Sequence, residues 1–263
     1  MNIDIKQLKN IVISASKEEL LHRFNSVKRN YKSDYSVVTE ADLVMQSRLI
    51  TQLHQAYPDI ALLGEEMSAD QQQTLLDSDS PLWCLDPVDG TSNFAAGVPY
   101  FCVSLALIEN GIVTLGLIYD PIREECFSAQ LGQGATLNNK KLSSQNTGLQ
   151  LKDAIAMIDF KRLTPELAKE LVINHPYASQ RSLGSIALEL CWIAAGRGHI
   201  YLHGKQQLWD YAAAQLILSE AGALALTLEG KPLQSNSLKA ISTLAASDKI
   251  LFNEWATYLN IPQ

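Results

Sequence analysis

Hydrophobic residues in the N-terminal half follow two periods, one typical of helices and one typical of strands. In residues 3–24 they recur every three to four positions, which predicts an amphipathic helix, and Leu43–Tyr57 is predicted as a second helix. Two apolar runs, Phe101–Glu109 and Ile112–Tyr119, are joined by Asn110-Gly111, a strong signal for a β-hairpin. We therefore expect two helices followed by an antiparallel meander.

The C-terminal half alternates between the two kinds of element. Thr164 followed by Pro165 predicts a helix start, and Ser247 is predicted to cap the last helix. The expected strands are 154–158, 199–202, 223–228 and 240–245, and the expected helices are 164–174, 185–195, 210–221 and 247–259. This alternation indicates a sheet that is covered by helices.

The domain organisation follows from the length of the chain and from one polar stretch. A chain of 263 residues is long enough for one large core or for two halves that share an interface. Polar residues 138–148 mark a seam between such halves. We expect a single domain over residues 1–263, with halves of about 1–140 and 150–263.

Composition excludes some classes of function. The hydrophobic fraction of 47% is that of an ordinary globular protein, and 28 acidic against 21 basic residues give a net charge of −7. Because nucleic-acid binding usually requires a basic excess, a nucleic-acid partner is not expected. The four cysteines form no C-x-x-C pair, which favours small buried side chains in a reducing compartment. No secretory leader and no long apolar run is present, so we predict a cytoplasmic protein without a membrane segment.

Candidate chemistry is concentrated in carboxylates that follow strands or begin helices. These five acids are Glu65, Glu66, Asp86, Asp89 and Asp210. Carboxylate oxygens are hard ligands that suit Mg²⁺. Any one of the five alone is more simply explained as a turn or a helix cap. Taken together they favour a cation site, because like charges crowded at strand ends are unfavourable without one.

A short turn follows the central pair of acids. Gly90-Thr91-Ser92 is placed to begin a helix, whose first N–H groups attract an anion such as a phosphate. Thr91 is either a plain N-cap or a ligand of a nucleophilic water, with Asp42 or Glu66 orienting it. Asp42 also has a structural explanation, because Thr39 to Asp42 has the spacing of a capping box.

Other familiar motifs are absent. Residues 198–205 resemble a phosphate-binding loop, but the spacing of the glycines is wrong and Gln206 replaces the required Ser or Thr. There is no G-x-S-x-G, so a serine hydrolase lacks its nucleophile. The five histidines show no spacing typical of metal ligands.

The remaining motifs resemble the inositol monophosphatase family of Mg²⁺-dependent, Li⁺-sensitive phosphatases. They occur in the family's order over about residues 28–222. The matching segments are Val38-Thr39-x-x-Asp42, Gly64-Glu65-Glu66, Asp86-Pro87-x-Asp89-Gly90-Thr91-x-Asn93-Phe94, Gly184-Ser185 and Trp209-Asp210-x-Ala212-Ala213 to Ala221-Gly222. The resemblance implies an α+β fold arranged as a layered αβαβα sandwich, and a homodimer.

The resemblance also implies a set of metal ligands. Glu65, Asp86 and the Val88 carbonyl would hold the Mg²⁺ that activates water. Asp86, Asp89 and Asp210 would hold a second Mg²⁺ near the leaving oxygen, so that two or three ions serve each active site. The mechanism that the resemblance implies is in-line displacement at phosphorus without a covalent intermediate.

The remaining roles concern the water and the phosphate. By the resemblance, Thr91, supported by Asp42 and Glu66, positions the nucleophilic water. Gly90, Thr91 and Ser92 cradle the phosphate through their N–H groups.

Substrate identity depends on less specific positions. Gly184 and Ser185 are expected to face the substrate, and Lys32 resembles a family lysine near the water. Members that hydrolyse inositol phosphates usually carry Glu seven residues before the aspartate of the Trp-Asp motif, but His203 occupies that position here. An imidazole still binds a hydroxyl, and when protonated it favours a second phosphate or a carboxylate.

We therefore expect a phosphatase for a small phosphomonoester, with inositol 1-phosphate or a related sugar phosphate first. Adenosine 3′,5′-bisphosphate and fructose 1,6-bisphosphate remain alternative substrates. A regulatory binding protein on the same fold is the alternative outside enzymes.

Overall fold

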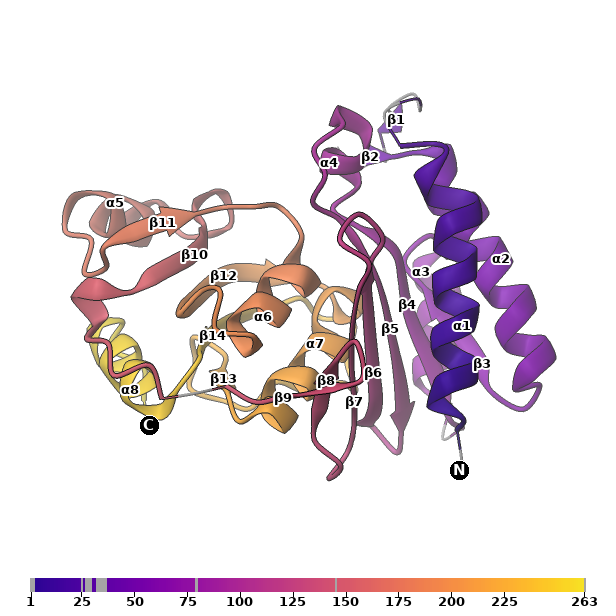
Figure 1. The fold of residues 1–263 in the computed structure, drawn as a ribbon. Helices are drawn as coiled ribbons and strands as arrows, with labels where there is room; N and C mark the ends of the chain where they lie inside the picture. The colour runs from indigo at the N-terminus through magenta and orange to yellow at the C-terminus, as the bar shows by residue number, and fades with distance from the viewer. Residues whose placement is uncertain are drawn as a thin grey trace.

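The computed structural model describes residues 3–24, 26, 30–31, 37–78, 80–144 and 146–262. Within these ranges the chain forms two large mixed sheets, with helices between them and on both outer sides (Figure 1). The predicted layered αβαβα sandwich is therefore confirmed. Lys32 lies outside the described residues.

The first sheet has seven strands in the order β3-β4-β5-β6-β7-β8-β9. β3 (Ala61–Gly64) runs parallel to β4 (Leu82–Asp89), and the other neighbours are antiparallel. The remaining strands are β5 (Cys102–Glu109), β6 (Ile112–Asp120), β7 (Glu125–Gln130), β8 (Ala135–Leu137) and β9 (Lys140–Leu142). The predicted hairpin joins β5 to β6, and Asn110 and Gly111 both have the positive φ that a tight two-residue turn requires.

The outer helices of the first sheet follow the predicted pattern with one addition. α1 (Ile5–Ser16), continued by a π-helical turn (Lys17–Leu21), and α2 (Glu40–Ala56) bury their apolar stripes against this sheet. α3 (Ala69–Leu76) was not predicted, because its Gln- and Asp-rich sequence is polar on nearly every side and only Gln72 is buried. The short elements here are α4 (Thr91–Ala96), β1 (Asn30–Tyr31) and β2 (Val37–Val38).

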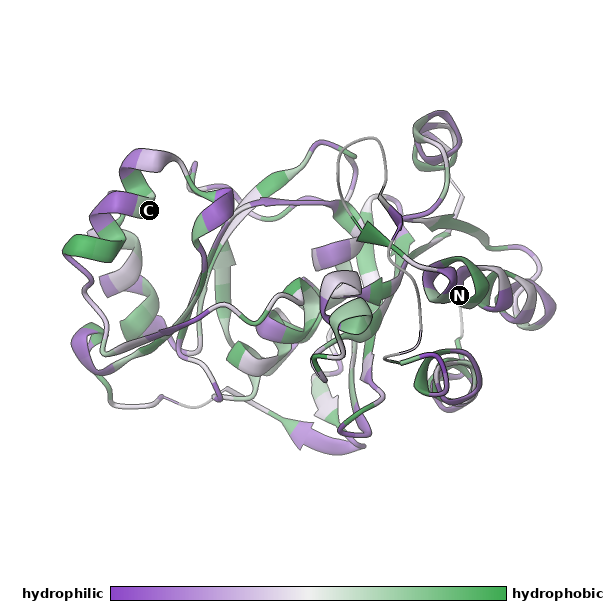
Figure 2. Cartoon of the chain, turned by 90° about the horizontal axis from the view of Figure 1, so that it is seen from above, coloured by the Kyte–Doolittle hydropathy of each residue, from purple (hydrophilic) through white to green (hydrophobic). Residues whose placement is uncertain are grey.

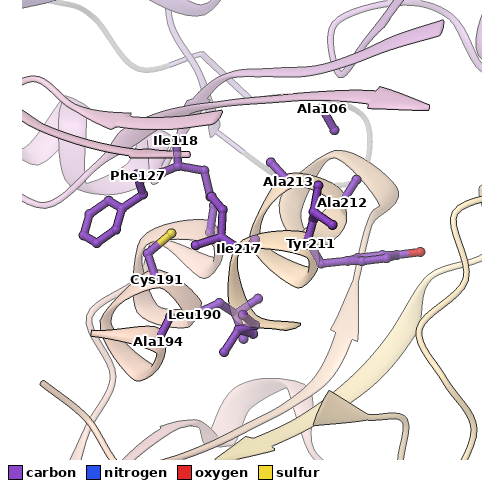
Figure 3. Packing of buried hydrophobic residues seen from close by; sticks show 14 of the residues in the cluster. Ala106, Ile118, Phe127, Leu190, Cys191, Ala194, Tyr211, Ala212, Ala213 and Ile217 are labelled. Carbon is purple, nitrogen blue, oxygen red and sulfur yellow. The ribbon is translucent and has the colours of Figure 1, made fainter. Parts of the chain in front are cut away.

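Two helices fill the space between the sheets. α6 (Ile186–Ala194) and α7 (Leu208–Ala221) are mostly buried, and their small residues allow close packing (Figure 3). The closest approach is at Gly116 of β6, where an added Cβ would lie 2.5 Å from the carbonyl oxygen of Ala213. α7 therefore lies directly on the first sheet.

The second sheet has five strands in the order β11-β10-β12-β14-β13. They are β10 (Ile155–Asp159), β11 (Ser179–Arg181), β12 (Ile200–Gln206), β13 (Leu224–Leu226) and β14 (Ile241–Ala246). Two 3₁₀ turns flank β10, Leu151–Asp153 and Phe160–Arg162. Seen from above, the layers stay distinct and the two termini lie on different layers (Figure 2).

The helices on the far side of the second sheet test two capping predictions. α5 (Pro165–Ile173) begins as predicted, with Thr164 as its N-cap and Pro165 at its first position. For α8 (Lys249–Tyr258) the prediction of Ser247 was wrong, because the N-cap is Asp248, whose carboxylate accepts hydrogen bonds from the N–H groups of the first turn. An aspartate satisfies two such donors at once, whereas a serine hydroxyl commonly satisfies one.

Two further predictions from composition can be compared with the structure. All four cysteines are free and buried, as expected for small apolar side chains. No helix among the described residues combines the length and the apolar character needed to cross a membrane.

Candidate active site

The C-terminal end of β4 contains an irregularity that determines where its two aspartates point. Asp86 pairs with Ser104 of β5, whereas Asp89 pairs with Cys102, so β4 has one residue more than its partner between the two pairs. This extra residue is a β-bulge at Pro87-Val88, a position at which a strand tolerates proline. Because Ser104 and Cys102 are two apart and share a face of β5, Asp86 and Asp89 also share that face.

The shared face is the one covered by α6 and α7. Ser104 Oγ donates a hydrogen bond of 3.0 Å to the carbonyl oxygen of Trp209, which brings the first turn of α7 to the end of β4. Asp210 follows directly, and its Oδ2 accepts a hydrogen bond from the N–H of Gln207 at 2.8 Å. The sequence-predicted Asp86, Asp89 and Asp210 are therefore gathered at one place from distant parts of the chain.

Asp89 is also the acceptor for the N-terminus of α6. Its Oδ2 lies 2.6 Å from Ser185 Oγ and 2.7 Å from Ala187 N, and its Oδ1 lies 3.1 Å from Ile186 N. Ser185 was predicted to face the substrate, and here its hydroxyl donates to Asp89. The two backbone donors were missed, because a backbone N–H leaves no signal in a sequence.

Thr91 and Asp42 meet as their places in the sequence motifs predict. Thr91 Oγ1 lies 3.0 Å from Asp42 Oδ1 and 3.0 Å from the carbonyl oxygen of Val88, and its single hydrogen can serve only one of them at a time. Thr39 donates to Asp42 Oδ2 from both its N–H and its hydroxyl, so the capping box is present as well. The capping role of Asp42 therefore does not conflict with the expected functional role, because the capping box and Thr91 use different oxygens.

Glu65 and Glu66 follow β3, the parallel neighbour of β4, so they lie at the same edge of the sheet. The N–H of Glu65 donates to the carbonyl oxygen of Leu85 at 3.1 Å, and that of Glu66 donates to Gln46 Oε1 at 3.0 Å. A Cβ at Gly64 would lie 2.1 Å from the same Gln46 oxygen, so a larger residue there would displace the end of this side chain.

The turn after β4 is fixed by glycine. Gly90 has φ of +98° and caps α4, which is only six residues long. A Cβ on Gly90 would lie 3.1 Å from the carbonyl oxygen of Tyr100 and 3.3 Å from that of Gly184. Gly184, whose φ is +83°, therefore comes within van der Waals reach of this turn, while Ser92 is exposed.

Burial and mutual repulsion dominate the electrostatics of this site. Burial, and then the negative charges of Glu65, Asp89 and Asp210, raise the pKa of Asp86 well above its ordinary value. The pKa of Asp210 is raised in the same way, by burial and then by Asp89. Burial also raises the pKa of Asp42 and of Asp89, although hydrogen bonds to each carboxylate act in the opposite direction.

The donor set fits a hard cation chemically, although it is not preassembled. Among the described residues, no three His, Cys, Asp or Glu side chains are already grouped as metal ligands. Asp86 Oδ1 accepts from the N–H of Val88 and Asp210 Oδ2 accepts from Gln207, so one oxygen of each is used locally. The second oxygens remain available, and a divalent cation would relieve the repulsion that raises these pKa values.

His203 makes different contacts from those expected of a substrate ligand. It is 3% exposed on β12, and its Nε2 lies 3.4 Å from Asp159 Oδ2 on the neighbouring strand. Its Nδ1 accepts from the N–H of Lys205 at 3.2 Å. Burial acts to raise the pKa of Asp159, but His203 and Lys161 together hold it below its ordinary value. Both ring nitrogens of His203 therefore already have partners within the second sheet.

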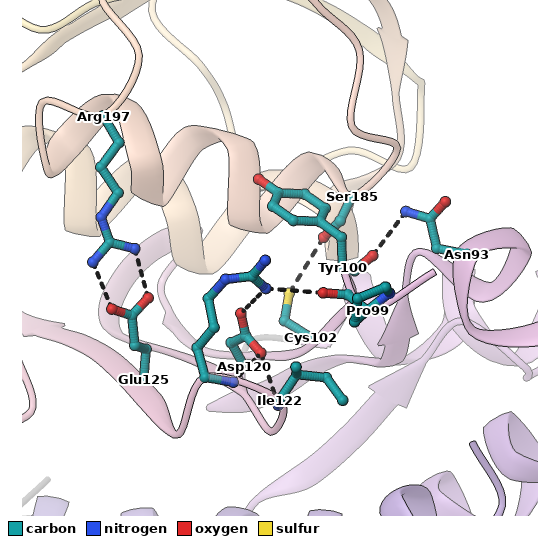
Figure 4. A network of polar contacts seen from close by, with 10 residues as sticks. Asn93, Pro99, Tyr100, Cys102, Asp120, Ile122, Glu125, Ser185 and Arg197 are labelled. Atoms are coloured by element: carbon teal, nitrogen blue, oxygen red, sulfur yellow. Dashed lines mark hydrogen bonds and ion pairs between the residues drawn. The ribbon is translucent and has the colours of Figure 1, made fainter. Parts of the chain in front are cut away.

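Asn93 is a further residue whose role the sequence does not reveal, although it lies inside the central motif. Its Nδ2 donates to the carbonyl oxygen of Tyr100 at 2.7 Å (Figure 4) and to that of Leu183, also at 2.7 Å. Arg197 and Glu125 form a second connection, at 2.6 Å, between the layer of α6 and the first sheet (Figure 4). The Asn93 hydrogen bonds and the Arg197–Glu125 ion pair therefore join the layer of α6 to the first sheet at two places.

Comparison with known proteins identifies the family of the chain. The model of the Inositol monophosphatase family matches residues 2–260. The chain belongs to the inositol monophosphatase family. It is 34% identical to inositol monophosphatase 1 of Solanum lycopersicum over 255 residues, covering 92% of each chain. It is 33% identical to the Nus factor SuhB of Xylella fastidiosa over 219 residues, which cover 82% of this chain and 75% of the relative.

A solved structure supports the same family. The staphylococcal IMPase-II bound to inositol monophosphate is 26% identical, with a TM-score of 0.81 over 97% of this chain and 94% of that one. Relatives thus include both proteins named as phosphatases and proteins named as Nus factors.

Proposed function

We propose that this chain is a cytoplasmic, homodimeric, Mg²⁺-dependent and Li⁺-sensitive phosphatase of a small phosphomonoester. The observation that carries the proposal is the contact of Thr91 with the buried Asp42, directly beside Asp86, Asp89 and Asp210. Membership of a family of phosphomonoesterases supports it. Hydroxyl, carboxylates and backbone donors at one strand end are the groups that phosphoryl transfer needs for positioning and for charge neutralisation.

The proposed ligands of Mg²⁺ are Glu65, Asp86, the Val88 carbonyl, Asp89 and Asp210. Bound there, Mg²⁺ supplies Lewis acidity, which lowers the pKa of water and neutralises charge on the phosphoryl group. The bulge at Pro87-Val88 keeps both β4 carboxylates on the same face, and Asp89 is held in place by its three donors.

The chain itself positions the nucleophile. With Asp42 Oδ1 as acceptor of the Thr91 hydrogen, the lone pairs of Thr91 Oγ1 are free to accept a hydrogen bond from the attacking water. Glu66 would support the same water from the end of β3. The N–H groups of Gly90, Thr91 and Ser92 would hold the phosphate, and the positive φ of Gly90 lets the backbone approach closely.

Inositol 1-phosphate or a related sugar phosphate is the first candidate substrate. The relative named inositol monophosphatase 1 and the inositol monophosphate bound by the staphylococcal protein support it. Gly184, Ser185 and His203 are the proposed contacts to the rest of the substrate. Adenosine 3′,5′-bisphosphate and fructose 1,6-bisphosphate remain alternatives, because His203 stands where inositol phosphatases usually carry Glu and its Nε2 lies 3.4 Å from Asp159 Oδ2.

The test is phosphate release from a panel of these substrates at fixed Mg²⁺. Asp89→Asn and Asp210→Asn should lower turnover by about 10³-fold or more, on the order expected when charge stabilisation and ligand binding are lost together. Asp153→Asn, at an exposed carboxylate outside the site, is the matched control and should behave as wild type. Near-normal turnover by folded Asp89→Asn or Asp210→Asn protein would refute the proposal.

A regulatory role through a protein partner is a second candidate, because relatives at 33–34% identity are named Nus factors. It predicts that a partner captured by the wild-type chain is also captured by the folded, inactive Asp210→Asn variant. Loss of capture in that variant would tie partner binding to the metal site instead.

A further inference from the structure

One buried carboxylate next to the site belongs to neither the proposed metal set nor the water set. Glu189 lies in the first turn of α6 and is 3% exposed. Its Oε1 accepts hydrogen bonds from the N–H groups of Leu183 at 2.6 Å and of Gly184 at 3.1 Å. The helix thus uses its own side chain to hold the segment that leads into it.

That segment is fixed from two directions. The N–H of Leu183 binds Glu189, and its carbonyl oxygen accepts the 2.7 Å hydrogen bond from Asn93 Nδ2. Gly184 has φ of +83°, and an added Cβ there would lie 3.2 Å from the same Asn93 nitrogen. Neither peptide group of Leu183 is therefore free to rotate without breaking a short hydrogen bond.

The held segment delivers the donors that reach Asp89. Ser185, Ile186 and Ala187 follow within four residues of Leu183, and all three donate to the Asp89 carboxylate. A rotation of the Leu183–Gly184 peptide would move these donors with it. Glu189 therefore affects the site indirectly, through the backbone of residues 183–187, and makes no contact with the reacting atoms.

We propose that Glu189 is a positioning residue whose charged carboxylate holds residues 183–187 in the arrangement that binds Asp89 and the substrate. The inference rests on the proposed phosphatase function for its kinetic part. Its structural part, the fixing of residues 183–187, stands independently of any activity.

The surroundings of Glu189 give the inference a pH dependence. The titratable groups that face it are Asp89 on β4, Asp159 on β10, Tyr100 before β5 and Tyr201 on β12. Burial raises the pKa of Glu189 to about 7, although the hydrogen bonds from Leu183 and Gly184 act to lower it. Near neutral pH the residue therefore passes between a neutral carboxyl and a carboxylate, and hydrogen bonds to the carboxylate are the stronger ones.

The contribution of Glu189 to the stability of the fold and its hold on residues 183–187 change in opposite directions with pH. A carboxyl whose folded pKa is raised contributes its full stability below the unfolded value, about 4.5, and loses it as the pH rises through about 7. The hold on residues 183–187 is strongest above pH 7, where Glu189 is charged. We therefore expect residues 183–187 to be best ordered above pH 7, where Glu189 contributes least to the stability of the fold.

The chain contains a matched control. Glu220, on α7, accepts from the N–H of Gly132 through Oε1 at 2.7 Å and from the N–H of Gly134 through Oε2 at 2.6 Å, so it also holds a loop by two backbone donors. That loop joins β7 to β8. Glu189→Gln, Glu189→Ala and Glu220→Ala therefore separate a general effect of losing such a carboxylate from an effect on the site.

The first measurement is amide hydrogen exchange followed by mass spectrometry. In Glu189→Ala, peptides covering 183–187 should exchange about 10-fold faster or more at pH 8, and in Glu220→Ala only peptides covering 132–134 should do so. If Glu189→Ala does not fold, wild-type protein at pH 6 and pH 8 gives the same answer, with faster exchange at 183–187 at the lower pH after correction for intrinsic rates. Unchanged exchange at 183–187 would overturn the inference, whether or not the protein is a phosphatase.

The second measurement is kcat and KM between pH 5.5 and 8.5, with inositol 1-phosphate and Mg²⁺ as the probe. Wild-type kcat/KM should contain a group that titrates near pH 7 and is absent from Glu189→Gln, which keeps the acceptor oxygen but not the charge. The variant should lose about 10-fold at pH 8 and little at pH 6, mainly through KM, while Glu220→Ala matches wild type. An identical pH profile in Glu189→Gln would refute the role of the charge, whereas an inactive wild type with the expected exchange result would refute only the proposed function.

Discussion

At the scale of single residues, two carboxylates of the candidate site use one oxygen for a helix cap and leave the other oxygen for the site. Asp42 gives Oδ2 to the capping box of α2 and Oδ1 to Thr91. Asp210 gives Oδ2 to the first turn of α7. Each residue therefore closes the capping box of its helix and keeps its other oxygen for further contacts, so a helix cap and a functional role are not competing explanations here.

Substitutions at Thr91 test the role of its hydrogen bond with Asp42 Oδ1. Thr91→Val keeps the shape of the side chain but removes the hydroxyl, so the water would lose its acceptor and Asp42 Oδ1 would lose its donor. We expect kcat to fall by about 10²-fold or more, within the range for loss of a group that assists proton transfer, while KM changes little. Thr91→Ser keeps the hydroxyl and should remain within about 10-fold of wild type. Equal loss in both variants would contradict this prediction, because it would show that the hydroxyl alone does not account for the role of Thr91.

Residue types explain what could be predicted about the site and what could not. Acids that follow strands form a recognisable pattern, so the sequence alone is enough to single out Glu65, Glu66, Asp86, Asp89 and Asp210. The backbone donors of Ile186 and Ala187 form none, because every residue except proline has an N–H group. The ion pair of His203 with Asp159 was equally invisible, since it joins neighbouring strands whose register a sequence does not reveal.

At the scale of elements, α8 shows how a cap is chosen between adjacent candidates. Ser247 and Asp248 are both good N-cap residues, and the periodicity of the sequence fits either one. Asp248 accepts from Ile250 and Leu251 and also from the N–H and hydroxyl of Thr147. Ser247 Oγ is buried without a hydrogen-bond partner among the described residues. Tertiary contact with Thr147 thus selects the aspartate, and local sequence does not contain that information.

These two residues make opposite predictions for stability. Asp248→Ala should lower the free energy of unfolding by about 1–2 kcal/mol at pH 7, because the first turn of α8 loses its acceptor. Ser247→Ala should be neutral or slightly stabilising, because it removes a buried hydroxyl that has no partner. Urea unfolding of both variants measures this. A greater loss in Ser247→Ala would contradict the assignment of the cap.

Wild type and Asp248→Ala also test a pH dependence of stability. Burial acts to raise the pKa of Asp248, but its hydrogen bonds from Leu251 and Thr147 leave it below its ordinary value. A lowered pKa contributes stability above the unfolded value, which is lost as the pH falls through the folded one. The difference between wild type and Asp248→Ala should therefore shrink below about pH 4.

Elements with strong periodicity or strong turn chemistry were the ones predicted. The β5–β6 hairpin and the start of α5 follow from Asn110-Gly111 and from Thr164-Pro165, whose backbone preferences are local. α3 and β11 were missed, because neither has an apolar face of its own. β11 exists through its pairing with β10, and α3 is anchored by one buried side chain, Gln72, which donates to the carbonyl oxygens of Gly64 and Glu65.

At the scale of the whole molecule, the site brings together one edge of the first sheet and helices from both of its faces. β3 and β4 supply four of the acids, α2 supplies Asp42, and α6 and α7 supply the donors to Asp89 and the last acid. Burial raises the pKa of Asp86, Asp89 and Asp210, and repulsion from neighbouring carboxylates adds to this effect for Asp86 and Asp210. The net charge of −7 adds to that repulsion, so a bound cation should stabilise the entire fold.

Thermal unfolding with and without Mg²⁺ tests this expectation. At a concentration about 100-fold above the dissociation constant, a ligand that binds only the folded state contributes about 2.7 kcal/mol. For a chain of this size we expect a rise in Tm of about 5 °C, reversed by a chelator. NaCl at equal ionic strength is the control for screening, and Asp210→Asn should lose most of the shift. An equal shift in that variant would place the bound ion elsewhere.

The extra residue in β4 has a consequence for how such a site is gained or lost. In a regular strand, residues three apart face opposite sides of the sheet, so Asp86 and Asp89 share a side only because the strand carries one more residue than its partner. Point substitution changes which group stands at a position but never the side on which it stands. Deletion or insertion of a single residue between the two aspartates changes that side for everything beyond it. The site is therefore encoded in the length of the chain at this point as much as in its composition, and a change of length there is not equivalent to any set of substitutions.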